Sequence, residues 1–142
     1  MKRKLLALAV AMTLFCTIVP TTVHAEPELE EIVTETIVEE YAYTNSITGT
    51  LSFSGSTATC QSTVTGNGYC TRIEGTQKLQ KKVLWWWTDV DTWSKSVDGK
   101  VLNMLNTATV TDSGTYRVRV EATVYSGNNS ENVYADSVEK TK

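Results

Sequence analysis

The segment that most constrains the fold is a tight turn that leads into an alternating run. The turn, Asp112–Tyr116, combines aspartate, serine and glycine, which favour turns, with a following tyrosine. After it, every second residue is small or branched and apolar: Val118, Val120, Ala122 and Val124. Since side chains of a β-strand alternate between the two faces of a sheet, this pattern predicts a strand over residues 115–125 with one buried face.

The rest of the region from Tyr41 to Val138 has the same texture of threonine, serine, valine and glycine at period two. Turn signals divide it at regular intervals: Gly55-Ser56, Gly66-Asn67-Gly68, Asp98-Gly99 and Gly127-Asn128-Asn129. We read Asp98-Gly99 as a hairpin turn. The pattern predicts an all-β fold, a single antiparallel β-sandwich of seven to eight strands over residues 45–138, with a short C-terminal tail over residues 139–142.

The turn before Tyr116 resembles the tyrosine corner of immunoglobulin-like sandwiches, in which the tyrosine hydroxyl hydrogen-bonds back to the turn. Asp112, Gly114 and Tyr116 would form this structural corner. The resemblance implies an immunoglobulin-like domain, and Cys60 matches the first cysteine of that family. Val118 stands at the second cysteine position and Ile73 roughly at that of the core tryptophan, so the usual disulfide and tryptophan of the family are both missing.

A second resemblance covers nearly the whole body. The chain is similar to a family of small secreted proteins of unknown function from Gram-positive, Clostridia-like bacteria. The segments that carry this resemblance, in order, are Ala58–Cys60 with Val64 and Gly66, Leu79–Lys82, Trp93–Ser96, Gly114–Val118 and Val124–Gly127. It implies a signal peptide followed by one immunoglobulin-like domain, and it assigns no activity and no catalytic residue.

The first 25 residues have the features of a secretory signal peptide. Lys2, Arg3 and Lys4 precede an apolar stretch of about 15 residues, which is shorter than the roughly 20 needed to span a bilayer. Val23-His24-Ala25 fits a cleavage site. We expect a secreted, extracellular protein that begins at Glu26 and has no transmembrane segment after cleavage. Lipidation at Cys16 is disfavoured, because Phe15 stands where a small residue is needed.

Charge is unevenly distributed along the expected mature chain. Residues 26–40 contain seven glutamates and no base, so residues 26–44 are expected to form an acidic linker or tether. Residues 41–142 contain ten basic and nine acidic residues. Neither part has the basic face that binding to a phosphate backbone requires, so nucleic acid is not an expected partner.

Residues suited to catalysis or metal binding are few. The only histidine, His24, leaves with the signal peptide, so the mature chain has no imidazole for a catalytic triad or a zinc site. Asp89 and Asp91, with Asp98, suggest a calcium site or a glycosidase pair only weakly, since no ligating loop or cleft accompanies them. We expect no enzymatic activity, no metal and no cofactor.

Two cysteines remain after the signal peptide, Cys60 and Cys70. In a secreted protein disulfides persist, so we expect these two to pair with each other. The alternatives are two separate thiols, one of them buried, or a reactive pair.

Four tryptophans, Trp85, Trp86, Trp87 and Trp93, are the strongest candidates for a ligand contact. Three adjacent strand residues cannot all face one core, so at least one should be exposed in a strand and two in a loop. We expect a binding module at or near the cell surface, with an unknown extracellular glycan or protein as partner. Alternatively, Trp86 is core, its neighbours Trp85 and Trp87 cover a sheet edge or a strand crossing, and Trp93 is ordinary sheet packing. A further alternative is a small structural or antagonistic protein whose tryptophans enter membrane interfaces.

Overall fold

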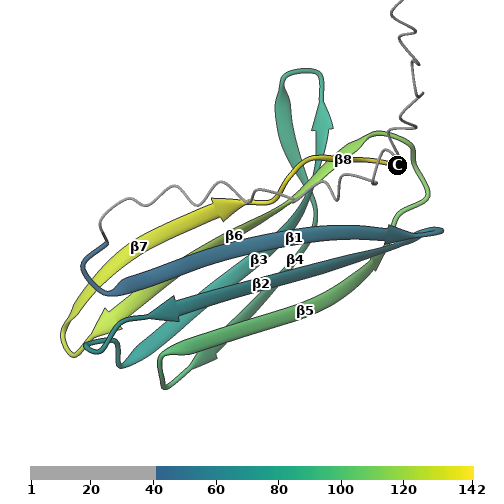
Figure 1. Cartoon of the computed structure of the whole chain (residues 1–142). Coiled ribbons are helices and arrows are strands. Elements are labelled where there is room, and N and C mark those ends of the chain that lie inside the picture. Colours follow the sequence, from purple (N-terminus) through teal and green to yellow (C-terminus); the bar gives the residue numbers. More distant parts are fainter. Residues whose placement is uncertain (1–40) are drawn as a thin grey trace, which may run out of the picture. The chain divides into compact units, whose positions relative to one another are not determined.

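The computed structural model of the chain describes residues 41–142 (Figure 1). The expected signal peptide and residues 26–40 of the expected linker lie outside the described residues. Within residues 41–142, no helix is long and apolar enough to cross a membrane.

Eight strands form two antiparallel sheets, which confirms the expected all-β sandwich. The strands are β1 (Thr44–Ser54), β2 (Thr57–Gly66), β3 (Arg72–Val83), β4 (Trp86–Val97), β5 (Val101–Thr109), β6 (Thr115–Ser126), β7 (Asn129–Asp136) and β8 (Lys140–Thr141). One sheet has the order β1-β2-β5. The other has the order β4-β3-β6-β7, and the short β8 pairs with β6. In β6 the buried and partly exposed residues alternate along almost the whole strand, as its sequence predicts.

Three hairpins and three crossings connect β1 to β7. The hairpins β1–β2, β3–β4 and β6–β7 each have a two-residue loop. The connections after β2, β4 and β5 lead from one sheet to the other. The expectation that Asp98-Gly99 closes a hairpin is therefore wrong. β5 pairs with β2 instead of β4, and an Asp-Gly turn is equally suited to a change of sheet.

The hydrophobic core between the sheets consists of two clusters. One includes Ile73, Leu102 and Val124, and the other includes Leu79 and Val118. A fully buried amide, Gln77 on β3, hydrogen-bonds to the opposite sheet through both of its polar atoms. Its Nε2 donates to Ser62 Oγ on β2 at 2.7 Å, and its Oε1 accepts from Asn106 Nδ2 on β5 at 2.8 Å. Since burying an unpaired amide is costly, these two bonds fix how the sheets face each other.

At one end of the sandwich, Tyr116 has the contact expected of a tyrosine corner. Its hydroxyl donates to the carbonyl oxygen of Asp112 at 2.9 Å, and its ring is buried edge-on against Phe53. Gly114 exchanges two backbone hydrogen bonds with Lys142. The segment expected to be a tail thus pairs with the start of β6 as β8.

At the other end, a single carboxylate holds the start of the sandwich. Glu131 on β7 accepts hydrogen bonds from the backbone N–H groups of Ala42 and Tyr43 and from the hydroxyl of Thr44, at 2.7–2.8 Å. Hydrogen bonds to a charged acceptor are stronger than neutral ones. Residues 42–44, which fall within the expected linker, are therefore attached to β7.

The expected disulfide between Cys60 and Cys70 is not formed, and both cysteines are buried free thiols. Cys60 lies in the middle of β2, whereas Cys70 lies against Gly66 at the end of that strand. Six residues of strand at about 3.3 Å each separate Cys60 from Gly66 by about 20 Å. A disulfide requires Cα atoms closer than about 7 Å, so the prediction from sequence was wrong because β2 is straight between the two positions.

Replacing Gln77 by leucine keeps the volume but leaves Ser62 and Asn106 without their buried partners. We expect the free energy of unfolding to fall by about 1–3 kcal/mol, measured by urea denaturation. Thr76→Val, which removes an exposed bond to Ser94, is the matched control and should change stability much less. If the Gln77→Leu variant and the wild type were equally stable, the two hydrogen bonds of Gln77 would not have the role assigned to them.

The thiols of Cys60 and Cys70 should resist labelling in the folded protein. Burial, with a smaller contribution from Asp91, raises the pKa of the Cys60 thiol to about 12, and burial also raises that of Cys70. We expect a thiol reagent to modify both residues in denaturant and neither at an appreciable rate in the native state, as measured by peptide mapping. A peptide pair linked through the two cysteines under non-reducing conditions would contradict the structure.

Candidate functional site

The β3–β4 hairpin extends beyond the rest of its sheet. β6 pairs with β3 only as far as Lys81, which lies opposite Tyr116. Beyond this point Lys82 and Val83 pair with β4 alone. Figure 1 shows the teal hairpin standing out from the other strands. Its two-residue loop consists of Leu84 and Trp85.

The end of this hairpin is an exposed apolar surface, the apolar tip, formed by Val83, Leu84, Trp85 and Trp86. Leu84 is 71% exposed, Trp85 80% and Trp86 44%. The two indole rings lie perpendicular to each other with their centroids 5.0 Å apart. The alternative that Trp86 belongs to the core is therefore wrong, and two of the three adjacent tryptophans are exposed.

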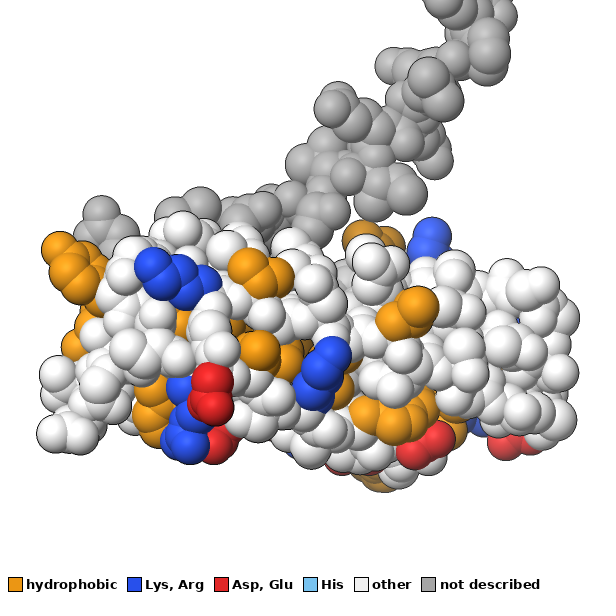
Figure 2. Space-filling model, turned by 90° about the horizontal axis from the view of Figure 1, so that it is seen from below, with side chains coloured by type: hydrophobic (Ala, Val, Ile, Leu, Met, Phe, Trp, Pro, Cys, Tyr) orange, Lys and Arg blue, Asp and Glu red, His pale blue; other side chains and the backbone are white. Residues whose placement is uncertain are grey.

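Exposed apolar side chains elsewhere in residues 41–142 do not form such a run. Leu105 on β5 and Tyr134 on β7 are well exposed but are single residues in polar strands. Figure 2 views the molecule from the side away from the apolar tip and shows orange side chains in separate patches between white surface. Scattered apolar groups are normal on a protein surface, whereas a continuous run often marks a contact site.

Behind the apolar tip, Trp87 is packed between two cationic side chains. The guanidinium carbon of Arg117 on β6 lies 4.2 Å from the centre of the Trp87 ring, and Lys82 Nζ lies 5.5 Å from it. Arg117 Nε also donates to Gln80 Oε1, and Gln80 Nε2 donates to Asp89. Desolvation by burial lowers the pKa of Arg117. These contacts brace the base of the hairpin against β6, so that Trp87 supports the apolar tip instead of belonging to it.

Trp93 lies away from the other three tryptophans. It pairs with Gln77 in the middle of β4 and packs against both core clusters. Six residues of β4 separate it from Trp87, or about 20 Å. The four tryptophans that the sequence grouped as one contact face therefore have three different surroundings, and only Trp85 and Trp86 are available to a partner as exposed rings.

Leu84 has a backbone conformation that is unusual for a large side chain. Its φ is +57°, and among residues 41–142 it is the only residue other than glycine with a positive φ. The two other hairpin loops have glycine at the same loop position, Gly55 with φ +57° and Gly127 with φ +60°. A leucine in the left-handed region is strained by about 1–2 kcal/mol. Strain of this kind is often retained at functional sites.

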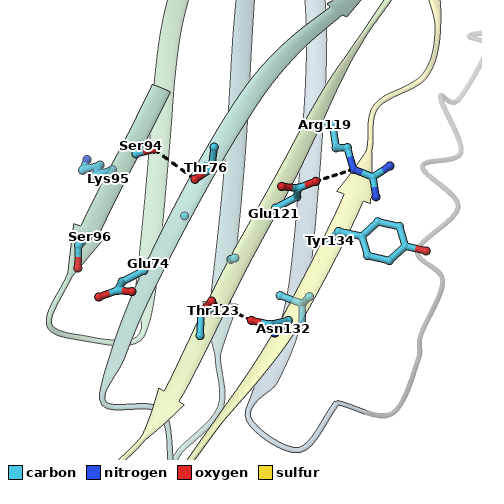
Figure 3. A pocket seen from close by; sticks show the side chains of 13 residues that line it. Glu74, Thr76, Ser94, Lys95, Ser96, Arg119, Glu121, Thr123, Asn132 and Tyr134 are labelled. Atoms are coloured by element: carbon cyan, nitrogen blue, oxygen red, sulfur yellow. Dashed lines mark hydrogen bonds and ion pairs between the residues drawn. The ribbon is translucent and has the colours of Figure 1, made fainter. Parts of the chain in front are cut away.

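The outer face of the β4-β3-β6-β7 sheet has an open groove of about 750 Å³. Its polar side chains bind one another, as Figure 3 shows for Thr76 with Ser94, Arg119 with Glu121, and Thr123 with Asn132. The hydrogen bond from Lys78 is the main reason why the pKa of Glu121 is lowered. A ligand in the groove would have to replace these interactions.

The acidic pair considered for calcium or glycoside chemistry is separated by a bulge. Asp89 lies opposite Gln80 and Asp91 lies opposite Leu79, with Val90 as the extra residue between them. Since Leu79 and Gln80 are consecutive, the two carboxylates are on opposite faces of β4. In the part of the chain that the structure describes, no three histidine, cysteine or acidic side chains come together to hold a metal ion.

Comparison with protein-family models, with curated proteins and with solved structures gives no match to this chain. The function must therefore be inferred from the geometry of the molecule itself.

Replacing Leu84 by glycine should stabilise the protein. The loss of strain exceeds the conformational entropy that glycine loses on folding, so we expect an increase of about 0.5–1 kcal/mol in the free energy of unfolding. Trp85→Gly is the control, because Trp85 has a negative φ in the same loop and gains no relief of strain. If the Leu84→Gly variant were less stable than the wild type, the Leu84 side chain would contribute to the stability of the fold, and the strain argument would be wrong.

Proposed function

We propose that the protein is a secreted, non-enzymatic, immunoglobulin-like interaction module that binds its partner through the apolar tip. The immunoglobulin-like assignment is supported by the Tyr116 to Asp112 hydrogen bond and by the division of the strands into a β1-β2-β5 sheet and a β4-β3-β6-β7 sheet. Secretion is supported by the features of residues 1–25. The observation that carries the binding role is the strained, projecting and continuously apolar loop.

The apolar tip is placed where it adds little to folding. Its residues lie beyond the last pair between β3 and β6, and none of them belongs to either core cluster. At about 1.5–3 kcal/mol for a fully buried apolar side chain, the exposed fractions of the four side chains correspond to about 3.5–7 kcal/mol if they were all removed from water. Before the cost of association is subtracted, this is the free energy of a dissociation constant between roughly 10 μM and a few millimolar. A single tip would therefore bind weakly, and tight attachment would need several copies or further contacts.

The shape of the apolar tip favours insertion over stacking. A platform for sugar rings needs flat indole faces side by side, whereas the rings of Trp85 and Trp86 are perpendicular. The tip is also convex, so it suits a partner that can close around it. The groove on the outer sheet face is less suitable as the main site, because its polar groups are already paired with each other.

The proposal is tested by measuring binding of the purified protein to a defined panel of purified peptidoglycan, soluble polysaccharides and lipid vesicles. We expect at least one member to be bound and to protect tryptophan fluorescence from an aqueous quencher. The Trp85→Ser, Trp86→Ser double variant should lose this binding at least tenfold. Leu105→Ser, which removes a similarly exposed apolar side chain on β5, is the control and should bind normally.

Binding that is unchanged in the double variant would place the contact elsewhere and overturn the proposal. Far-ultraviolet circular dichroism and the urea midpoint of each variant show whether it is folded, so that loss of binding is not confused with loss of structure.

A further inference from the structure

We propose that the partner of the apolar tip is the interfacial region of a lipid bilayer, with a moderate preference for anionic headgroups. This inference rests on the proposed function and names the class of partner for the same site. It follows from the backbone of the hairpin, from its side chains and from the charges behind it.

The backbone of the β3–β4 hairpin suits the interfacial layer of a bilayer, where water and headgroup oxygens remain available to its open strand edges. Unpaired polar backbone groups are costly in hydrocarbon, and a minimal loop limits how many of them the end of the hairpin carries. Here Val83 and Trp86 are paired across a loop of only two residues. The positive φ of Leu84 is what allows so short a loop to carry two large apolar side chains at its end. A longer loop would bring more unpaired N–H and carbonyl groups to the contact.

The side chains of the apolar tip match the interfacial layer of a bilayer. Tryptophan concentrates at membrane–water interfaces, where its ring is in an apolar layer and its N–H in a polar one. Trp85 and Trp86 supply two such rings, and Leu84, in the loop that connects β3 and β4, supplies an exposed aliphatic side chain. No charged residue interrupts the run from Val83 to Trp87. A convex apolar loop can enter a deformable bilayer without a preformed pocket, which a protein partner would have to supply.

Basic side chains lie directly behind the apolar tip. Lys82 and Arg117 hold Trp87 between them. Lys81 and Lys140 both lie opposite Tyr116, one on each side of β6, so they are in the same row of the sheet. We call these four residues the basic rim. When the apolar tip enters a bilayer, the basic rim comes close to the level of the lipid phosphates.

The basic rim is partly neutralised, which limits the expected preference for anionic lipid. Lys82 pairs with Glu139 at 3.5 Å, and both side chains are about half exposed. Arg117 pairs more closely with Asp136, at 3.0 Å, and Lys81 pairs with Asp112 at 3.5 Å. Exposed ion pairs such as Lys82–Glu139 contribute little to stability. Lys82 can therefore exchange Glu139 for a lipid phosphate at a small cost in free energy. Lys140 is exposed and makes no ion pair within residues 41–142. One or two available cations, at about 1 kcal/mol each, correspond to a gain of about five- to thirtyfold on an anionic surface.

Co-sedimentation with vesicles tests the inference. The test compares phosphatidylcholine vesicles with and without a minority of phosphatidylglycerol, at low and at physiological salt concentration. The protein is expected to bind both, about five- to thirtyfold more strongly with phosphatidylglycerol at low salt, with a blue shift of tryptophan emission. Bromine-labelled lipids should quench this emission most strongly when the bromine is near the headgroup end of the acyl chain.

Three variants separate the contributions. Trp85→Ser with Trp86→Ser should reduce partitioning into both kinds of vesicle more than tenfold. Lys140→Gln should leave binding to phosphatidylcholine unchanged and reduce the preference for phosphatidylglycerol several-fold. Leu105→Ser, with its side chain exposed on β5, should behave as the wild type.

The outcomes separate this inference from the proposed function. If vesicles are not bound but the double tryptophan variant loses binding to peptidoglycan or a polysaccharide, the apolar tip is a contact site for that polymer and the bilayer inference is wrong. If vesicles are bound equally by wild type and double variant, or if bromine does not quench, the inference is also wrong. If nothing in the panel depends on Trp85 and Trp86, both proposals fail.

Discussion

Two hydrogen bonds from one buried amide determine how the halves of this sandwich meet. Gln77 has only one position in which its nitrogen reaches Ser62 and its oxygen reaches Asn106. A slip of β3 by one residue would turn the amide to solvent and bring Thr76 or Lys78 into the core. The apolar clusters on either side could tolerate small displacements, since dispersion and burial have little directional preference. The amide cannot, because each unmade bond would leave a polar group buried without a partner.

The projection of the hairpin follows from the register of β3 against β6 in its own sheet. Gln77 lies opposite Val120, and β3 reaches its last partner on β6 at Lys81, where the turn at Asp112–Gly114 ends the shared ladder. The residues that follow can pair only with β4. The corner that closes one end of the sandwich thus also determines where the hairpin leaves it. Arg117, one residue after the corner tyrosine, then supports the free part of the hairpin through Trp87.

The sequence was sufficient for the class of fold and for features contained within one strand or one turn. Alternation in residues 115–125 predicts the buried face of β6, and the turn before Tyr116 predicts the corner geometry. Features that depend on which strands pair could not be read in this way. The change of sheet at Asp98-Gly99, the distance between Cys60 and Cys70, and the bulge at Val90 each depend on pairing partners far along the chain. The tryptophans show both cases. Exposure of two neighbours follows from alternation and a loop, whereas the partial burial of Trp93 depends on its position opposite Gln77.

The separation of Leu84 and Trp85 from the rest of the sandwich has a consequence for how such a protein can change over generations. Residues in a core cluster can be replaced only together with their neighbours, because close packing leaves no room for independent change. The two loop residues contact neither cluster, and the ladder of the hairpin holds the loop in place, with the positive φ at Leu84 as the one local restriction on the side chain. Substitutions there would alter the proposed contact surface while leaving the packed core unchanged. One scaffold could therefore diversify into a set of proteins with different targets by mutation at a single loop.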